Sequence, residues 1–168
     1  YPANFILVGS MNPCPCCYYG SKDRECTCSP YQIKRYKEKI SGPLLDRMDI
    51  RINVDNVKYD DLASGEESES SEQVRKRVNR TRAVQLERFK DDGITSNGEM
   101  SEKHIKKYCK LSAEGEDVLR YAFESLKMSA RARSRILKVA RTIADMELSE
   151  NIETNHLLEA ISYRGDDL

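Results

Sequence analysis

Two stretches of the chain carry the hydrophobic patterns of β-strands. The first, "FILV" at residues 5–8, is a continuous apolar run that ends at a Gly-Ser pair. Such a run is typical of a strand buried on both faces of a parallel sheet. In the second, Ile50, Ile52 and Val54 alternate with polar residues, as in a half-exposed edge strand. Because a strand cannot exist alone and the chain starts at Tyr1, we expect a piece of a longer protein whose neighbouring strands lie upstream.

Helical patterns occupy most of the remaining chain. Residues 29–40 predict a short helix in which Ser29 is the N-cap and Gln32 completes a capping box. Further helices are expected after Ser70, from about residues 101 and 112, and after Ser129, and a last one begins at Thr154. Their expected core-facing residues are Val74, Val78, Gln85, Phe89, Val118, Leu119, Ala122, Phe123, Leu126, Ile136, Val139, Ala140, Ile143, Ala144, Leu157, Ala160 and Ile161.

An acidic stretch of low complexity separates the two halves of the chain. Residues 58–69 contain most of the run "SGEESESSE" and predict a solvated linker. Residues 1–57 then form one part, with two strands, a cysteine loop and a helix. Residues 70–168 form a compact helical bundle. The predicted fold class is an α/β fragment that is mainly α.

Charge is balanced overall but unevenly distributed along the chain. Lys plus Arg and Asp plus Glu number 28 each, so the net charge gives no indication of a nucleic-acid partner. The helix at 74–89 is strongly basic and could follow a nucleic-acid backbone. No aromatic residues interleave with its charges, and the acidic linker can pair with them, so a solvated helix face is the favoured interpretation.

The six cysteines point to a reducing compartment and to metal binding. No stretch reaches the roughly 20 apolar residues of a membrane span, and no signal peptide is recognisable, so we expect a cytoplasmic protein without a membrane partner. Two C-x-C pairs, separated by a nine-residue spacer, could bring four thiolates together around a structural Zn²⁺. Those residues are Cys14, Cys16, Cys26 and Cys28. Incidental free thiols and redox chemistry are the alternatives. Cys17 directly follows Cys16 and is not needed for a set of four ligands. Cys109 is expected in a helix, as a small core residue.

Asn12 stands where the first predicted strand has ended. Ligands of open α/β sheets bind at the carboxyl ends of strands, and a polar side chain there can hold a water or a phosphate oxygen. The alternative is that Asn12 and Pro13 simply start a turn, and spacing alone favours this alternative.

Longer motifs resemble a known family over nearly the whole chain. "MNPCPC", the second C-x-C pair and "SGPLLDRMD" resemble the second half of the AAA+ core of magnesium-chelatase-related ATPases of the ComM/YifB type. "SARARSRILKVARTIADME" and "HLLEAISYR" resemble the C-terminal helical lid domain of that family. One departure is Cys17, which stands where the family usually has Gly. This residue could compete with Cys16 as a metal ligand.

The resemblance implies roles for three polar residues. Asn12 corresponds to sensor 1, which orients the attacking water, and Arg47 corresponds to an arginine finger that reaches a neighbouring subunit's nucleotide. Arg131 corresponds to sensor 2 at the start of a lid helix. A planar, permanently charged guanidinium suits the charge on transferring phosphate oxygens. The alternatives are an ion pair of Arg47 with Asp46 or Asp49, and simple solvation of Arg131.

The same resemblance implies an ATP-hydrolysing ring that uses ATP and Mg²⁺. We expect a homo-oligomer, a hexamer, that remodels DNA by branch migration, as in natural transformation. No G-x-x-x-x-G-K-[ST] phosphate loop occurs in this sequence, so the chain should not hydrolyse ATP alone. Two other classes stay open, namely a zinc-stabilised binding module without ATPase activity and a true magnesium chelatase subunit. The C-x-C loop speaks against the chelatase.

Overall fold

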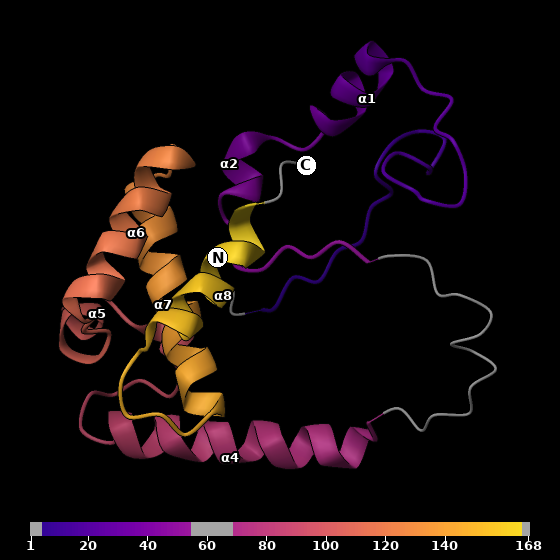
Figure 1. Cartoon of the computed structure of the whole chain (residues 1–168). Coiled ribbons are helices and arrows are strands. Elements are labelled where there is room, and N and C mark those ends of the chain that lie inside the picture. Colours follow the sequence, from indigo (N-terminus) through magenta and orange to yellow (C-terminus); the bar gives the residue numbers. More distant parts are fainter. Residues whose placement is uncertain (1–4, 55–68, 166–168) are drawn as a thin grey trace. The chain divides into compact units, whose positions relative to one another are not determined.

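The computed structural model describes residues 5–54 and 69–165, which form two compact units (Figure 1). The cysteine unit comprises described residues 5–45 and Val54, and the helical unit comprises Asp46–Asn53 with residues 69–165. Each unit is described by itself below. The expected acidic linker at 58–69 lies outside the described residues except for Glu69. The division of the chain into 1–57 and 70–168 stays a prediction.

The cysteine unit consists of a long loop followed by two short helices. The helices are α1 (Pro30–Lys37) and α2 (Gly42–Leu45). The predicted capping box of α1 is confirmed, since Ser29 Oγ accepts the Gln32 N–H at 3.3 Å. In return, the Ser29 N–H donates to Gln32 Oε1 at 2.8 Å. These two bonds satisfy backbone donors that the first helical turn would otherwise leave without partners.

Neither predicted strand forms within the described residues. Phe5, Ile6, Leu7 and Val8 have no regular secondary structure, and their exposed fractions are 73, 91, 56 and 88%. Ile50, Ile52 and Val54 also lie outside any strand. A strand is defined by bonds to a neighbouring strand, and the described chain supplies none. The apolar pattern therefore remains, but the element that it predicts does not form.

The helical unit confirms the mainly helical fold class. It contains α4 (Ser71–Phe89), the 3₁₀ turn η1 (Asn97–Glu99), α5 (Glu102–Tyr108), α6 (Ala113–Ser125), α7 (Ala130–Met146) and α8 (Thr154–Gly165). Helix α7 packs against α4, α5, η1 and α8, and α6 packs against α8 (Figure 1). The predicted N-caps Ser70 and Ser129 both accept a backbone N–H of their helix.

The core of the helical unit follows the predicted apolar stripes closely on α7 and α8. Leu157 and Ala160 are buried, as are four of the five expected residues of α7, whereas Val139 is half-buried. Leu119 and Ala122 of α6 are buried, but Leu126, the C-cap that follows the helix, is exposed. Full burial of a Leu or Ile side chain stabilises a fold by about 1.5–3 kcal/mol, so α7 provides much of the stability of the unit.

Only the C-terminal part of α4 packs against the bundle, although its whole apolar stripe was expected in the core. Gln85 and Phe89 are buried, but Val74 and Val78 are exposed. The helix extends beyond the other helices of its unit (Figure 1). Its first turns therefore present a basic surface with two exposed valines. The prediction of burial at Val74 and Val78 is wrong, because no helix among the described residues covers them.

One buried carboxylate organises the contact between α4, η1 and α7. Asp145 is fully buried and pairs with both Nη atoms of Arg88 and with Arg141 Nε, the latter at 3.0 Å. Asn97 Nδ2 donates to the same carboxylate at 2.8 Å. The remaining donors of Arg141 bind the Ser149 and Glu150 carbonyls at 2.6 and 2.8 Å. Such full pairing is what allows charges to be buried.

Within the described residues, no helix combines the length and the apolar character that crossing a membrane requires.

Candidate functional site

The four cysteines of the two C-x-C pairs come together in the loop of the cysteine unit. The Sγ atoms of Cys14, Cys16, Cys26 and Cys28 all lie within 4.8 Å of one another. Cys14 Sγ is 3.4 Å from Cys16 Sγ and 3.7 Å from Cys26 Sγ, and the last two are 3.5 Å apart. A tetrahedral zinc site with Zn–S bonds of about 2.3 Å has sulfur atoms about 3.8 Å apart. The spacing of the thiols therefore fits a zinc ion.

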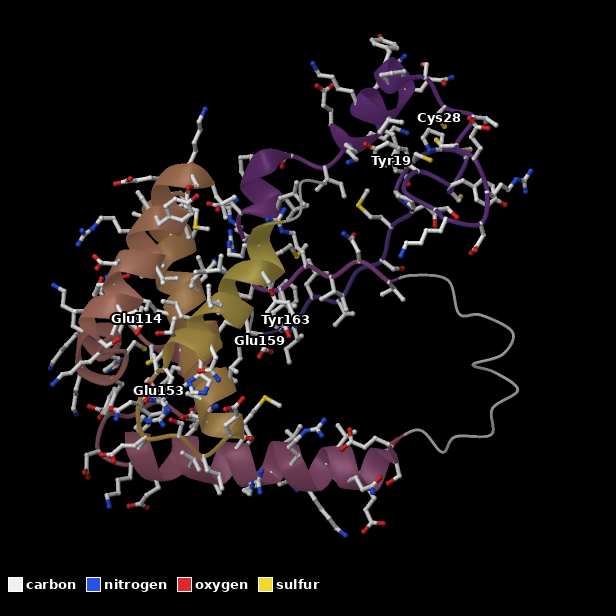
Figure 2. All side chains as sticks on the ribbon, in the orientation of Figure 1. Tyr19, Cys28, Glu114, Glu153, Glu159 and Tyr163 are labelled. Atoms are coloured by element: carbon white, nitrogen blue, oxygen red, sulfur yellow. The ribbon has the colours of Figure 1, made fainter. Side chains whose placement is uncertain are left out.

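Backbone groups around the cluster support the same geometry. The Tyr19 N–H donates to Cys14 Sγ at 3.4 Å, and the Cys17 N–H donates to the Cys14 carbonyl at 3.0 Å. Figure 2 shows Tyr19 and Cys28 in this loop. Hydrogen bonds to ligand atoms orient them before a metal binds. Short-range turns thus help to close the loop around the four thiols.

The thiols of the cluster differ in acidity. A backbone N–H from Tyr18 lowers the pKa of Cys16 to about 5, whereas burial and the neighbouring thiols raise the pKa of Cys28 to about 12. Zinc binds thiolates, so the ion would have to displace a proton from Cys28 at neutral pH. Four protein ligands leave no open coordination position, so zinc held by this set would be structural.

Cys17 lies outside the group of four. It is exposed, and its φ of +72° is in the left-handed region that favours glycine. A glycine at this position would adopt the same φ without strain, in keeping with the expectation that the family has Gly here. Cys109 is buried in the helical core, as expected, and burial raises its pKa to about 11.

The three polar residues to which the family resemblance assigns roles lie in different units. Asn12 belongs to the cysteine unit, where it is exposed two residues before the first ligand of the cluster. Arg47 and Arg131 belong to the helical unit, and both are exposed. The predicted position of Asn12 at a strand end is wrong for the described chain because no strand forms there. Its proposed chemical role stays a prediction.

Both acidic neighbours of Arg47 have arginine partners of their own. Asp46 Oδ1 accepts from Arg164 Nη2 at 3.0 Å, and Asp49 pairs with Arg135. Both carboxylates that the alternative names as partners of Arg47 therefore already bind another guanidinium.

Arg131 is the second residue of α7 and lines an open groove of about 870 Å³. The groove also presents other polar and charged side chains of the helical unit, among them Asp49, Glu102, Ser134, Arg135 and Lys138. Arg135 and burial both lower the pKa of Lys138, with burial the larger cause. A groove with several cations and an exposed arginine at a helix start can accept an anionic ligand.

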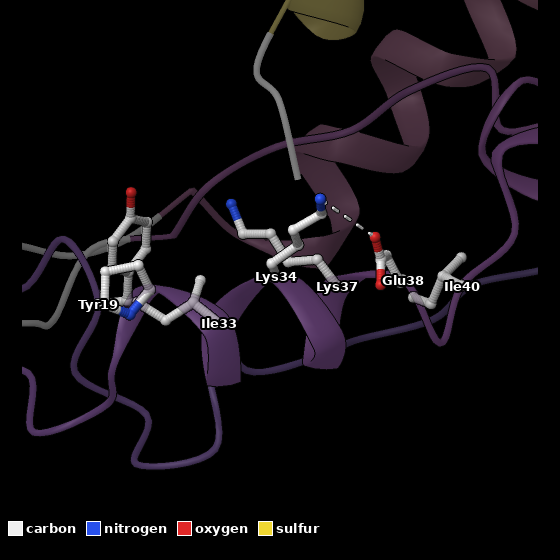
Figure 3. A pocket seen from close by; sticks show the side chains of 7 residues that line it. Tyr19, Ile33, Lys34, Lys37, Glu38 and Ile40 are labelled. Carbon is white, nitrogen blue, oxygen red and sulfur yellow. Dashed lines mark ion pairs between the residues drawn. The ribbon is translucent and has the colours of Figure 1, made fainter.

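A second groove lies on α1 of the cysteine unit (Figure 3). It has a volume of about 530 Å³ and is lined by Tyr19, Pro30, Ile33, Lys34, Lys37, Glu38 and Ile40. Lys34 Nζ lies 3.9 Å from Glu38 Oε1, and Lys37 Nζ lies 5.1 Å from the centroid of the Tyr19 ring. These exposed pairs contribute little energy, and no group of nucleophile and base is formed.

Sequence reasoning missed two sets of residues that organise the helical unit. One is the buried cluster around Asp145, and the other is the pair of Arg164 with Asp46. A third of the residues in this chain are charged, and in the sequence the members of these two sets look like any other solvated charges. One feature of the sequence could have indicated the buried cluster. Arg141 and Asp145 are four residues apart and follow Ala140 and Ala144 of the apolar stripe, so they share the buried face of the helix.

Comparison with known proteins places both halves of the chain in one family. Residues 68–164 match the family described as magnesium chelatase, subunit ChlI C-terminal, and residues 1–62 match magnesium chelatase, subunit ChlI. The chain therefore belongs to the magnesium chelatase ChlI family, and its relatives are of the ComM/YifB type.

The relatives align over almost the full length of the chain. Competence protein ComM of Haemophilus influenzae is 41% identical over 98% of the chain, and YifB of Salmonella typhimurium is 39% identical over 99%. YifB of Escherichia coli is also 39% identical. The chain spans 31–32% of the length of these proteins.

Proposed function

We propose that this chain is the C-terminal part of a ring-forming ATPase and supplies residues that sense and trigger hydrolysis of ATP. The phosphate-binding loop and the Mg²⁺ ligands would come from the remainder of a longer protein. Asn12 would orient the attacking water, Arg131 would face the nucleotide from the lid, and Arg47 would act in a neighbouring subunit. The domains would be a core part at 1–57, a linker and a lid at 70–168.

The observation that best supports this proposal is the exposure of Arg47 between residues that other side chains hold. Arg47 is exposed, and the carboxylates on either side of it, Asp46 and Asp49, are held by Arg164 and Arg135. An exposed residue in a segment that is held on both sides can face an adjacent subunit. Its fixed positive charge would neutralise charge spread over phosphate oxygens in the transition state.

The thiol cluster would have a structural role in such a machine. Cys14, Cys16, Cys26 and Cys28 would hold zinc, which supplies a rigid tetrahedral cross-link. Asn12 is two residues from the first of these ligands, so the cross-link would limit the positions available to its side chain. The chemistry of the reaction itself would not involve this metal.

DNA is the proposed substrate of the assembled ring. The support is the likeness to a protein named for competence, together with the basic exposed turns of α4. We further propose a hexameric ring in the cytoplasm that remodels DNA during natural transformation.

The decisive experiment is Arg47→Ala in the full-length protein. Loss of a trans-acting arginine is expected to lower ATP turnover by about 10³-fold or more while leaving nucleotide binding nearly intact. Steady-state ATPase assays and fluorescent-nucleotide titration measure the two quantities. Arg120→Ala is a matched control, because Arg120 is an exposed arginine of α6 that pairs only loosely with Asp117, at 3.4 Å. Unchanged turnover in the Arg47 variant would reject the assignment.

A further inference from the structure

One buried guanidinium binds the residues on both sides of Arg47. Arg164, in the last turns of α8, donates from Nη1 to the Met48 carbonyl at 2.8 Å. Its Nη2 donates to Asp46 Oδ1 at 3.0 Å and lies 3.4 Å from the Asp46 carbonyl oxygen. The Arg164 side chain is only 6% exposed. The chain is thus held immediately before and after Arg47, and Arg47 itself is exposed.

The Asp46 carboxylate also binds the start of α7. Its Oδ2 accepts from Ser129 Oγ at 3.0 Å. Ser129 is the N-cap of α7, and its Oγ accepts the Ala132 N–H at 3.2 Å. Arg131 lies inside that capped first turn. A short chain of hydrogen bonds therefore runs from Arg164 through Asp46 to the turn that carries Arg131.

Further contacts fasten the same segment along its length. Asp49 pairs with Arg135 of α7, one turn beyond Arg131. The Arg51 N–H donates to the Tyr163 carbonyl at 3.0 Å, and the Arg51 guanidinium binds the Arg164 carbonyl. Tyr163 is labelled on α8 in Figure 2. The segment 46–51 is therefore attached to both α7 and α8, and a shift of either helix must move it.

We propose that Arg164 is a positioning residue that holds Arg47, through Asp46 and the Met48 carbonyl, in one placement relative to Arg131. This inference rests on the proposed function of Arg47 and Arg131. Arginine suits the task because its planar fork can donate to two acceptors at once, whereas lysine offers a single charged nitrogen. Arg131 would face the nucleotide of its own subunit, and Arg47 would face the nucleotide of the neighbouring subunit. The hydrogen bonds through Arg164 and Asp46 would therefore couple adjacent nucleotide sites around a ring.

The test compares Arg164→Met, Arg164→Lys and Asp46→Asn in the full-length protein. Displacing a catalytic group by about 1 Å can cost about 100-fold in rate, so Arg164→Met is expected to lower kcat by about 10- to 100-fold. The KM for ATP should change by less than about 3-fold, because substrate binding does not use Arg47. Arg164→Lys should lower kcat by a smaller factor, and the control Arg120→Met should match the unmodified protein.

A double variant separates positioning from general stability. If Arg164 acts through Arg47, then Arg47→Ala/Arg164→Met should turn over no more slowly than Arg47→Ala alone. If Arg164 contributes independently of Arg47, the two losses should multiply. A multiplied loss would overturn the inference even though each single variant is slow.

The failure of this inference can be distinguished from the failure of the proposed function. Full turnover by Arg47→Ala would reject the proposed role of Arg47, and the inference with it. Slow turnover by Arg47→Ala with full turnover by folded Arg164→Met would reject only the positioning role. If Arg164→Met does not fold, Asp46→Asn tests the inference instead. The Asp46 side chain is 34% exposed, so the only buried charge that this substitution affects is Arg164, which loses one charged partner. Full turnover by Asp46→Asn would overturn the inference.

Discussion

The two units of this protein are stabilised by different means. In the described residues 5–45, Cys14 is the one buried residue, whereas the helical unit buries a continuous apolar core between α4, α5, α6, α7 and α8. A segment of this size without an apolar core gains too little from burial to order itself. Within the described residues, the four-thiol cluster is therefore the candidate to provide in the cysteine unit what packing provides in the helical unit.

The units also differ in how they present their candidate functional residues. Asn12 lies in a loop that depends on the thiol cluster, and the apolar run at 5–8 next to it is exposed. Arg47 lies in a segment attached to two packed helices by Asp46, Asp49 and Arg51. Loss of the metal should therefore disturb the position of Asn12 before that of Arg47. A substitution in the helical core should disturb the position of Arg47 before that of Asn12.

Removal of the metal ligands should have the largest effect and should be confined to the cysteine unit. Protein purified without chelator is expected to carry about one zinc ion per chain, and Cys26→Ser should abolish this. Structural zinc contributes about 10–16 kcal/mol in small zinc-folded peptides, so the loop should lose its order. Hydrogen exchange should show fast exchange at the Tyr19 amide and unchanged protection in α7.

Cys17→Gly is the matched control for that experiment. Cys17 lies outside the four-thiol group and has a positive φ, so glycine should retain the zinc and relieve about 1 kcal/mol of backbone strain. Protein without zinc whose thiols all titrate freely would contradict the proposed role of the cluster. Loss of zinc from the Cys17 variant would instead place this residue among the ligands.

Breaking the buried ion cluster should give the next largest effect, in the helical unit. Asp145→Ala leaves the buried Arg141 and the half-buried Arg88 without their shared carboxylate, which should lower the free energy of unfolding by about 3–5 kcal/mol. Urea unfolding followed by circular dichroism measures this change. Asp117→Ala removes an exposed partner of Arg120 and should change stability by less than about 1 kcal/mol. Equal effects of the two substitutions would refute the distinction.

The smallest expected effect is a dependence of stability on pH that comes from Asp92. Hydrogen bonds from Tyr108 Oη and then Lys107 lower the pKa of Asp92 below 3.8. A carboxylate with a depressed pKa in the folded state stabilises the fold at neutral pH, and this contribution is lost as the pH falls through the folded-state pKa. The stability should therefore fall below about pH 4, and Asp92→Asn should flatten that part of the curve. An unchanged curve would exclude Asp92 as its origin.

Local features of this protein were predictable from the sequence. The caps at Ser29, Ser70 and Ser129 and the two C-x-C pairs depend on contacts between residues close in the chain. The stripe on α7 was also predicted, because helical spacing alone puts Ile136, Ala140 and Ile143 on one face. The strands at 5–8 and 50–54 were not obtained, because a strand requires hydrogen bonds to another strand and the described chain offers none.

What the sequence determined by itself is the set of capped helices, the thiol spacing and the family to which the chain belongs. The tertiary structure alone decided which of the many charged residues are buried. Arg141 and Arg164 are buried and Arg88 is half-buried, although all three have the same chemistry as the solvated arginines around them. Packing gives Arg88 and Arg141 the buried Asp145 carboxylate, and it gives Arg164 the half-buried Asp46 carboxylate. The physical reason is desolvation, because a charge can be buried only where the fold supplies its partners, and Arg88 and Arg164 receive their carboxylates from distant parts of the chain.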